Sequence, residues 1–354
     1  MKLNTRRFDL QLTHRWAIAS GLAAGGGGGT SIFKVVFVEL HDKDGIIGLG
    51  EAAPSSRYGE SADGAQAFLQ HVLPEKLSFN DIEGSMAYVN SIASGNMAAK
   101  GAINIALLDG AGKKARKPIY ELLDLGFTEN KHVTSFSIGI DKPEMIRKKV
   151  QEAEQYPVLK LKVGNPEEKE NLAALREVAP KKAVRVDANE GWKTKEEALR
   201  KLEWLASDGN IQFVEQPMPV STPLKDLVWL KERSPLPIMA DESYHLSTDI
   251  KQCQEWAHSV NVKLAKTGGI TAAREALLAA RKAGLKTMIG CMIESSVLIS
   301  AGAHLGELAD YLDLDGNILI SNDPYQGVAT QKGIMSFASA SEDFGLRVRA
   351  RSSP

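Results

Sequence analysis

Three acidic residues close successive short apolar runs in this sequence with a steady spacing. They are Asp187, Glu215 and Asp241, and the intervals are 215 − 187 = 28 and 241 − 215 = 26 residues. Each interval matches one strand-plus-helix unit, which takes ~30 residues or slightly fewer. Carboxylates at corresponding ends of successive parallel strands converge on one point, and ligands that offer only oxygen suit a hard divalent cation. We therefore predict that these three residues bind Mg²⁺.

The segment before the acids, Val158–Gly164, alternates strictly between apolar and basic residues. On a strand this alternation directs Lys160 and Lys162 to one face and the leucines to the other. An edge strand with lysines facing solvent would show the same pattern. The three acidic strand ends that follow favour lysines directed toward the acids instead.

A second basic strand lies further along the chain, at residues 259–264. Alternation directs Lys263 to its inner face, whereas Lys266 lies beyond the strand and is the weaker candidate. In a ring of eight strands, the second and sixth face each other, so a substrate between them meets one lysine on each face. Two bases on opposite faces of one carbon are what racemisation or epimerisation requires. We assign Lys160 to polarising the substrate carboxylate.

Strands and helices must alternate to position these residues, and from about 133 to 315 the pattern does so. The predicted strands are 133–138, 158–163, 183–187, 211–215, 236–241, 259–264, 286–290 and 311–315. Eight such units predict a TIM barrel with functional residues at the strand C-termini. A doubly wound sheet is the structural alternative.

The rest of the chain has a different organisation. Residues 1–125 show antiparallel strand patterns followed by helices, which predicts an α+β capping domain. The barrel then spans 126–317, and the segment 318–354 is expected to return to the capping domain. The glycine run Gly25–Gly29 predicts either a floppy hairpin loop or a mobile lid over an active site.

Bulk composition narrows the class of partner. The chain has 354 residues and 43 basic against 44 acidic residues, a net charge of −1 that gives no case for nucleic acid or an anionic membrane surface. Two cysteines, no signal peptide and no long apolar run favour a cytoplasmic protein without a membrane span. Assembly into a homo-oligomer stays open.

These motifs together resemble the muconate-lactonizing subgroup of the enolase superfamily, over essentially the whole chain. The resemblance rests on the following segments: Lys160–Lys162, Asp187–Asn189, Glu215–Pro217, Asp241–Ser243, Asn261–Lys263 and Lys266–Gly269. It implies a (β/α)7β TIM-type barrel, Mg²⁺ and acid/base lysines that fall on Lys162 and Lys263. The proton would move between them through an enediolate that the metal stabilises.

The eighth strand distinguishes members of the subgroup. Asp313 and Asp315 face inward together, and two anions suit a cationic group of the substrate. This Asp-x-Asp pair is similar to that of dipeptide epimerases, in which it binds the ammonium of a dipeptide substrate. The segment that contains Met292 and Ile293 also resembles the end of their seventh strand, and Ser135 on the first strand is a further candidate for contact with substrate.

The expected activity is epimerisation of the C-terminal residue of a dipeptide. Ala-Glu epimerases carry a cation in the loop after their first strand, but here residues 17–30 contain no Lys or Arg. Arg57, on a second loop of the capping domain, is only a weak substitute for that cation. Because the first loop lacks a cation, we expect an apolar or small second residue in the substrate. The alternatives are L-Ala-D/L-Glu epimerase proper, a cycloisomerase, o-succinylbenzoate synthase, or a barrel that has lost catalysis.

Overall fold

The computed structural model describes residues 1–19, 21, 29–340 and 342–352. Its centre is a sheet of eight parallel strands that follow one another in chain order. The strands are β4 (Phe136–Ile138), β5 (Val158–Lys162), β6 (Ala183–Asp187), β7 (Ile211–Glu215), β8 (Ile238–Ala240), β9 (Ser259–Lys263), β10 (Lys286–Gly290) and β11 (Tyr311–Asp313).

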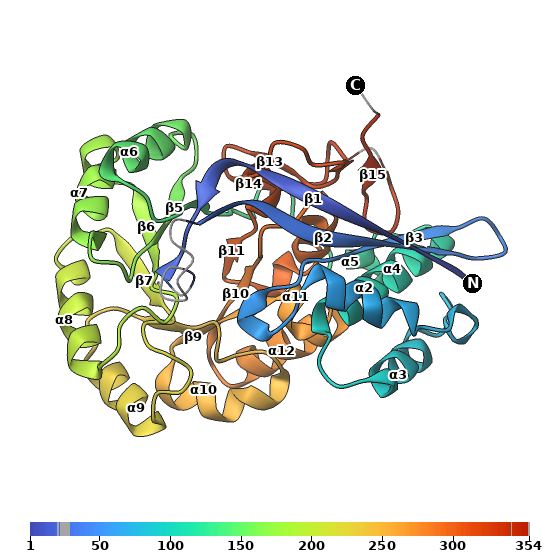
Figure 1. The fold of residues 1–354 in the computed structure, drawn as a ribbon, viewed down its shortest axis with the longest axis horizontal. Coiled ribbons are helices and arrows are strands. Elements are labelled where there is room, and N and C mark those ends of the chain that lie inside the picture. The colour runs from blue at the N-terminus through green and yellow to red at the C-terminus, as the bar shows by residue number, and fades with distance from the viewer. Residues whose placement is uncertain (20, 22–28, 341, 353–354) are drawn as a thin grey trace.

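The first and last of these strands also meet. Thr134 forms a parallel bridge with Leu312, and the amide of Ser135 donates to the carbonyl of Leu312 at 3.2 Å. The sheet is therefore a nearly closed barrel (Figure 1), which confirms the predicted barrel. A doubly wound sheet keeps its two edge strands apart and is excluded.

Eight α-helices connect and cover the barrel strands in the described residues. They are α6 (Pro143–Glu152), α7 (Glu168–Val178), α8 (Lys195–Ala206), α9 (Leu224–Arg233), α10 (Ile250–Trp256), α11 (Leu264–Thr267), α12 (Ile270–Lys282) and α13 (Ser296–Ala303). In α8 the buried residues Ala198, Leu202 and Leu205 recur at helical spacing, and the hydroxyl of Thr194 caps the helix by accepting from the amide of Glu197. Short 3-10 helices are η3 (Ser247–Asp249), η4 (Gly306–Leu308) and η5 (Gly316–Ile318).

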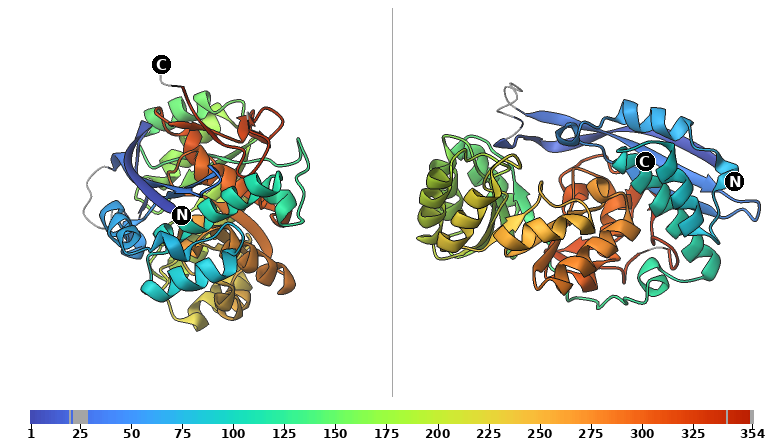
Figure 2. Two further views of the ribbon diagram at one scale, coloured as in Figure 1. Left: turned by 90° about the vertical axis from the view of Figure 1, so that its right-hand side faces the viewer. Right: turned by 90° about the horizontal axis from the view of Figure 1, so that it is seen from below.

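The N-terminal part forms a separate layer, the cap, over one end of the barrel (Figure 2). Its antiparallel sheet contains β1 (Lys2–Trp16), β2 (Thr30–His41) and β3 (Ile47–Ala52) in that order. Its helices are η1 (Ser56–Tyr58), α2 (Ala62–Gln70), η2 (Pro74–Lys76), α3 (Ile82–Ile92), α4 (Met97–Ala115) and α5 (Ile119–Leu122). The long β1–β2 ribbon extends from these helices to the barrel strands β5–β7 (Figure 1).

Helix α4 lies so close to β3 that the sheet needs glycine at the contact. A Cβ atom at Gly50 would lie 2.0 Å from the carbonyl oxygen of Ala102, and one at Gly48 would lie 2.0 Å from that of Ala106. Both neighbours are backbone atoms that cannot rotate away. The sequence therefore permits close packing of the cap only because these two positions lack side chains.

We expect Gly50→Ala to lower the free energy of unfolding by about 1–3 kcal/mol, the usual cost of overpacking a well-packed contact. Urea unfolding followed by circular dichroism measures this. Gly64→Ala is the matched control, because its nearest contact is the Ser61 hydroxyl at 3.4 Å and alanine is a good helix former. Equal stability of the two variants would contradict the packing argument.

The C-terminal segment contacts the cap, as expected from the sequence. Leu12 bridges Ile320, and the amide of Leu346 donates to the Asp109 carboxylate of α4 at 2.8 Å. Its strands are β12 (Tyr325–Gln326), β13 (Ala329–Gln331), β14 (Ile334–Ser336) and β15 (Arg349–Ala350). The boundaries placed at 125 and 317 stay a prediction.

Two further expectations from the sequence concern the glycine run and the membrane. The predicted lid or hairpin at Gly25–Gly29 lies, apart from Gly29, outside the described residues. Among the helices of the described residues, none combines the length and the apolar character needed to cross a bilayer.

Candidate active site

The three predicted metal ligands converge at the C-terminal ends of adjacent strands. Asp187 and Glu215 are the last residues of β6 and β7 and are paired in register, and Asp241 directly follows β8. One carboxylate oxygen of each lies within 4.8 Å of the others, and all three side chains are fully buried. The strand alternation therefore brings together the set of acids that the spacing predicted.

The donor set fits a hard divalent cation. Three buried carboxylates repel one another, and burial together with the nearby Asp187 raises the pKa of Glu215 to about 7. Buried charges of one sign are stable only when cations compensate them, and lysine side chains contact all three carboxylates. Oxygen ligands that converge from three rigid strands suit Mg²⁺ better than a softer metal, which would select sulfur or imidazole.

The two lysines of β5 reach these acids from one side. Lys160 Nζ lies 2.7 Å from Glu215 Oε2, 3.1 Å from Asp187 Oδ2 and 2.7 Å from Asp313 Oδ2. Lys162 Nζ donates to Asp187 Oδ2 at 2.6 Å. Lys160 is 1% exposed, and although burial acts to lower its pKa, Asp313 and the other carboxylates raise the pKa well above its ordinary value.

Lys263 reaches the acids from the opposite strand. Its Nζ donates to Asp241 Oδ2 at 2.6 Å. Burial acts to lower the pKa of Lys263, but Asp241 and Glu215 outweigh it and raise the pKa well above the ordinary value. The predicted inward register of β9 is thus the observed one.

Lys266 lies closer to the acids than the sequence indicated. It is in the short helix α11, and its Nζ donates to both the carbonyl and the Oδ1 of Asp241 at 2.5 Å. Its position beyond the strand made it the weaker candidate in the sequence. The helical turn directly after β9 folds it back, a feature that the Lys-x-x-Lys spacing could have revealed.

Asp313 and Asp315 both lie at the end of the eighth strand, but only Asp313 belongs to the strand itself. The predicted strand 311–315 ends at Asp313, and Asp315 instead precedes η5. The amide of Ser137 donates to Asp315 Oδ2 at 2.6 Å. Burial and the neighbouring Asp313 raise the pKa of Asp315 to about 6, whereas Lys160 overcomes burial and lowers the pKa of Asp313 to about 2.

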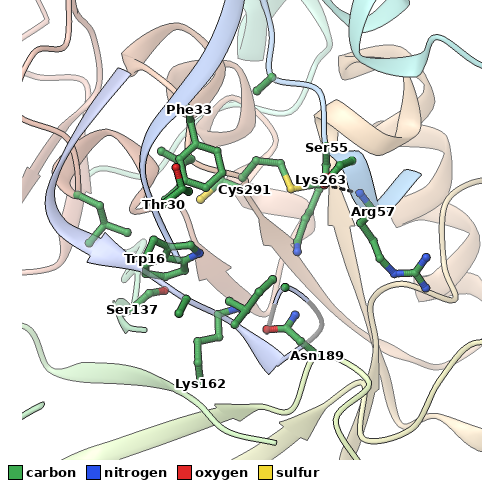
Figure 3. A pocket seen from close by; sticks show the side chains of 18 of the residues that line it. Trp16, Thr30, Phe33, Ser55, Arg57, Ser137, Lys162, Asn189, Lys263 and Cys291 are labelled. Atoms are coloured by element: carbon green, nitrogen blue, oxygen red, sulfur yellow. Dashed lines mark hydrogen bonds between the residues drawn. The ribbon is translucent and has the colours of Figure 1, made fainter. Parts of the chain in front are cut away.

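A cavity of about 730 Å³ connects most of these side chains. The predicted residues that line it are Lys160, Lys162, Lys263, Met292, Ile293, Asp313 and Asp315. Figure 3 shows Lys162 and Lys263 extending into the cavity from different walls. A substrate inside it would meet an ammonium on each side.

Ser135 does not line this cavity. It is fully buried, and its hydroxyl donates to Asp313 Oδ1 at 2.7 Å. The geometry therefore gives Ser135 a positioning role behind Asp313 in place of the predicted contact with substrate. Its neighbour two residues on, Ser137, does line the cavity.

The cap supplies an apolar wall that sequence reasoning missed. The apolar residues of this wall are Trp16, Ile18, Phe33, Val35, Ala53 and Pro54. Trp16 and Phe33 stand at the two ends of the glycine-rich connection and extend into the cavity (Figure 3). Their large aromatic side chains beside a loop of mostly small residues were a signal that the sequence contained.

Family comparison agrees with this fold. Residues 27–124 match the N-terminal domain of mandelate racemase and muconate lactonizing enzyme, and residues 145–319 match the enolase C-terminal domain-like family. The chain therefore belongs to the mandelate racemase/muconate lactonizing enzyme group of the enolase superfamily.

Individual relatives are epimerases. The chain is 64% identical to an L-Ala-D/L-amino acid epimerase of Pedosphaera parvula, over 97% of this chain and 98% of that protein. It resembles the Enterococcus faecalis dipeptide epimerase solved with Mg and L-Leu-L-Tyr (TM-score 0.87, 30% identity, 98% of both chains). The Cytophaga hutchinsonii dipeptide epimerase solved with Mg and D-Ala-L-Val is similar (TM-score 0.88, 30% identity, 99% of this chain and 95% of that chain). The class of enzyme is thus an isomerase.

Proposed function

We propose that this isomerase inverts the α-carbon of the C-terminal residue of a dipeptide whose second residue is apolar or small. The observation that carries the proposal is the placement of Lys162 and Lys263 on different walls of one cavity, around three converging carboxylates. A carbon held between two ammonium or amine groups can lose a proton to one and regain it from the other on the opposite face.

The lysines would divide the proton transfer between them. Lys162, when neutral, removes the α-proton from one epimer, and Lys263 delivers a proton to the other face. The reverse reaction exchanges their roles. Lys160, fully buried between Asp313 and Glu215, would place its positive charge beside the substrate carboxylate.

Asp187, Glu215 and Asp241 would hold Mg²⁺. When bound, this ion would stabilise the negative charge that forms on the substrate carboxylate. It would also share the carboxylates that otherwise raise the pKa of Lys263.

The ammonium and the second side chain of the substrate would each meet a complementary part of the cavity wall. Asp313 and Asp315 lie in the cavity wall beyond Lys160 and can accept hydrogen bonds from the ammonium of the first residue. With the carboxylate and ammonium so held, the second side chain faces the cap. The apolar wall formed by Trp16, Phe33 and their neighbours favours an apolar side chain there.

A dipeptide screen in D₂O tests the proposal. Incorporation of deuterium at the α-carbon of the second residue, detected by mass spectrometry, is expected for dipeptides such as Ala-Leu, Ala-Val and Ala-Ala. A cycloisomerase or a synthase of the same family would leave these dipeptides unlabelled, and so would a barrel without catalysis. Labelling of the first residue instead would reverse the assigned orientation.

Asp313→Asn and Asp315→Asn should each raise KM for a dipeptide. A charge-assisted hydrogen bond lost from a closed site costs about 1.5–3 kcal/mol, which corresponds to roughly ten- to a hundredfold. N-acetylated dipeptides should be poor substrates for the unmodified protein, because they lack the cation.

Asp310→Asn is the control for these variants, since Asp310 precedes the same strand at its other end and accepts from the amide of Thr287. Steady-state kinetics with free and N-acetylated Ala-Leu provide the measurement. Equal kcat/KM for the two substrates would remove the role assigned to the acid pair.

A further inference from the structure

An ion pair joins the cap to the barrel at the wall of the substrate cavity. Arg57, in η1 of the cap, lines the cavity (Figure 3). Its Nε donates to Glu190 Oε2 at 2.6 Å and its Nη2 donates to Glu190 Oε1 at 2.7 Å. Glu190 follows β6, three residues after Asp187. The pair is therefore bidentate, with each carboxylate oxygen facing one nitrogen of the guanidinium.

The barrel holds the Glu190 carboxylate at this place. The amide of Val220 donates to its Oε1 at 2.8 Å, and the carboxylate side chain is 10% exposed. Asn189 and Glu190 have φ values of 40° and 65°. Two successive non-glycine residues adopt this left-handed backbone only where the surrounding contacts hold them in it. Glu190 is thus a fixed partner for Arg57.

Arg57 is the cation best placed to meet the second side chain of a dipeptide. Lys160, Lys162 and Lys263 are engaged with carboxylates at the centre of the site. Lys34 also borders the cavity, but it is exposed and is adjacent on β2 to Phe33, which extends inward in Figure 3. Neighbouring residues of a strand point to opposite faces, so Lys34 leaves β2 on the face opposite Phe33.

We infer that Glu190 determines the charge preference of the site by neutralising Arg57, so that an acidic second residue finds this guanidinium already paired. This inference rests on the proposed function and names the residue pair that sets its specificity. An acidic substrate side chain would have to displace a bidentate, charge-assisted pair to reach Arg57. An uncharged side chain has no such requirement.

Removing either partner should change the preference in opposite directions. Glu190→Gln releases Arg57, so the ratio of kcat/KM for Ala-Glu to that for Ala-Leu should rise by about tenfold or more. Arg57→Met leaves the Glu190 carboxylate in place, so the ratio for Ala-Lys to Ala-Leu should rise by about the same factor. Epimerisation in D₂O, measured for the three dipeptides with each variant, gives both ratios.

Glu177→Gln is the matched control. Glu177 accepts from Nε and Nη2 of Arg147 at 2.6 and 3.2 Å in an exposed bidentate pair, and neither residue lines the cavity. This variant should keep both ratios at the unmodified values. A general loss of stability would lower all three activities together and would not produce opposite shifts.

The outcomes separate the inference from the function beneath it. Both ratios within about twofold of the unmodified protein would overturn the inference alone. If Glu190→Gln is inactive, the Ala-Lys to Ala-Leu ratio of Arg57→Met alone tests the inference. If both variants are inactive toward Ala-Leu, the ion pair is needed for the structure of the site, and the inference is overturned. Failure of the unmodified protein to turn over any of the three dipeptides would overturn the proposed function, and the inference with it.

Discussion

Lys162→Ala and Lys263→Ala should each abolish epimerisation while keeping exchange of the α-hydrogen in one epimer only. In the proposed mechanism each lysine serves one face of the α-carbon, because the two side chains enter the cavity from different walls. A positioned acid or base typically contributes 10²–10⁴-fold, and inversion needs both, so turnover should fall by at least about 10³-fold. The residual exchange should appear with the L epimer in one variant and with the D epimer in the other.

The measurement combines polarimetry, which follows inversion, with mass spectrometry of each pure epimer in D₂O, which follows exchange. Lys286→Ala is the control, since Lys286 begins β10 at the other end of the barrel and is exposed. Lys266 is unsuitable as a control, because its ammonium contacts Asp241. Exchange of both epimers by a single-lysine variant would contradict the division of roles.

Loss of any of the three strand-end carboxylates should abolish turnover. Asp187→Asn, Glu215→Gln and Asp241→Asn each keep the shape of the side chain but remove one of the charges that a hard divalent cation needs. The unmodified protein should lose activity in EDTA and recover it when Mg²⁺ is supplied in excess. Isothermal titration of Mg²⁺ should show binding to the unmodified protein and strongly weakened binding to each variant.

Asp208→Asn controls for removal of an acid elsewhere, because Asp208 pairs with Arg176 and does not line the cavity. Full activity of the chelator-treated protein would contradict the metal-assisted mechanism. Normal Mg²⁺ binding by Asp241→Asn would instead remove that residue from the ligand set and leave its contacts with Lys263 and Lys266 as its role.

The sequence by itself determined the barrel and the chemical character of its functional end. Periodicity is local, and a strand of alternating residues reveals its inner face before the fold is known. Alternation and spacing therefore predicted the inward direction of five side chains, those of Asp187, Glu215, Asp241, Lys162 and Lys263. Their convergence then followed from the regular geometry that all parallel barrels share.

Contacts that depend on how separate elements meet were decided only by the tertiary structure. The closure of β4 against β11 places Ser135 behind Asp313 in place of a position in the cavity. Likewise, the helical turn after β9 returns Lys266 to Asp241. No spacing in the chain specifies either contact, because each partner's direction is set by packing against other elements.

The contacts between the cap and the barrel could not be predicted from the sequence either. Arg57 was a candidate cation for the substrate, but its charge is paired with Glu190, which lies 133 residues further along the chain. The pairing exists because the cap rests on the mouth of the barrel, and the same docking brings Trp16 into the cavity. Residue types therefore determined the chemistry of the site, whereas the packing of the cap against the barrel decided which charged side chains pair with one another.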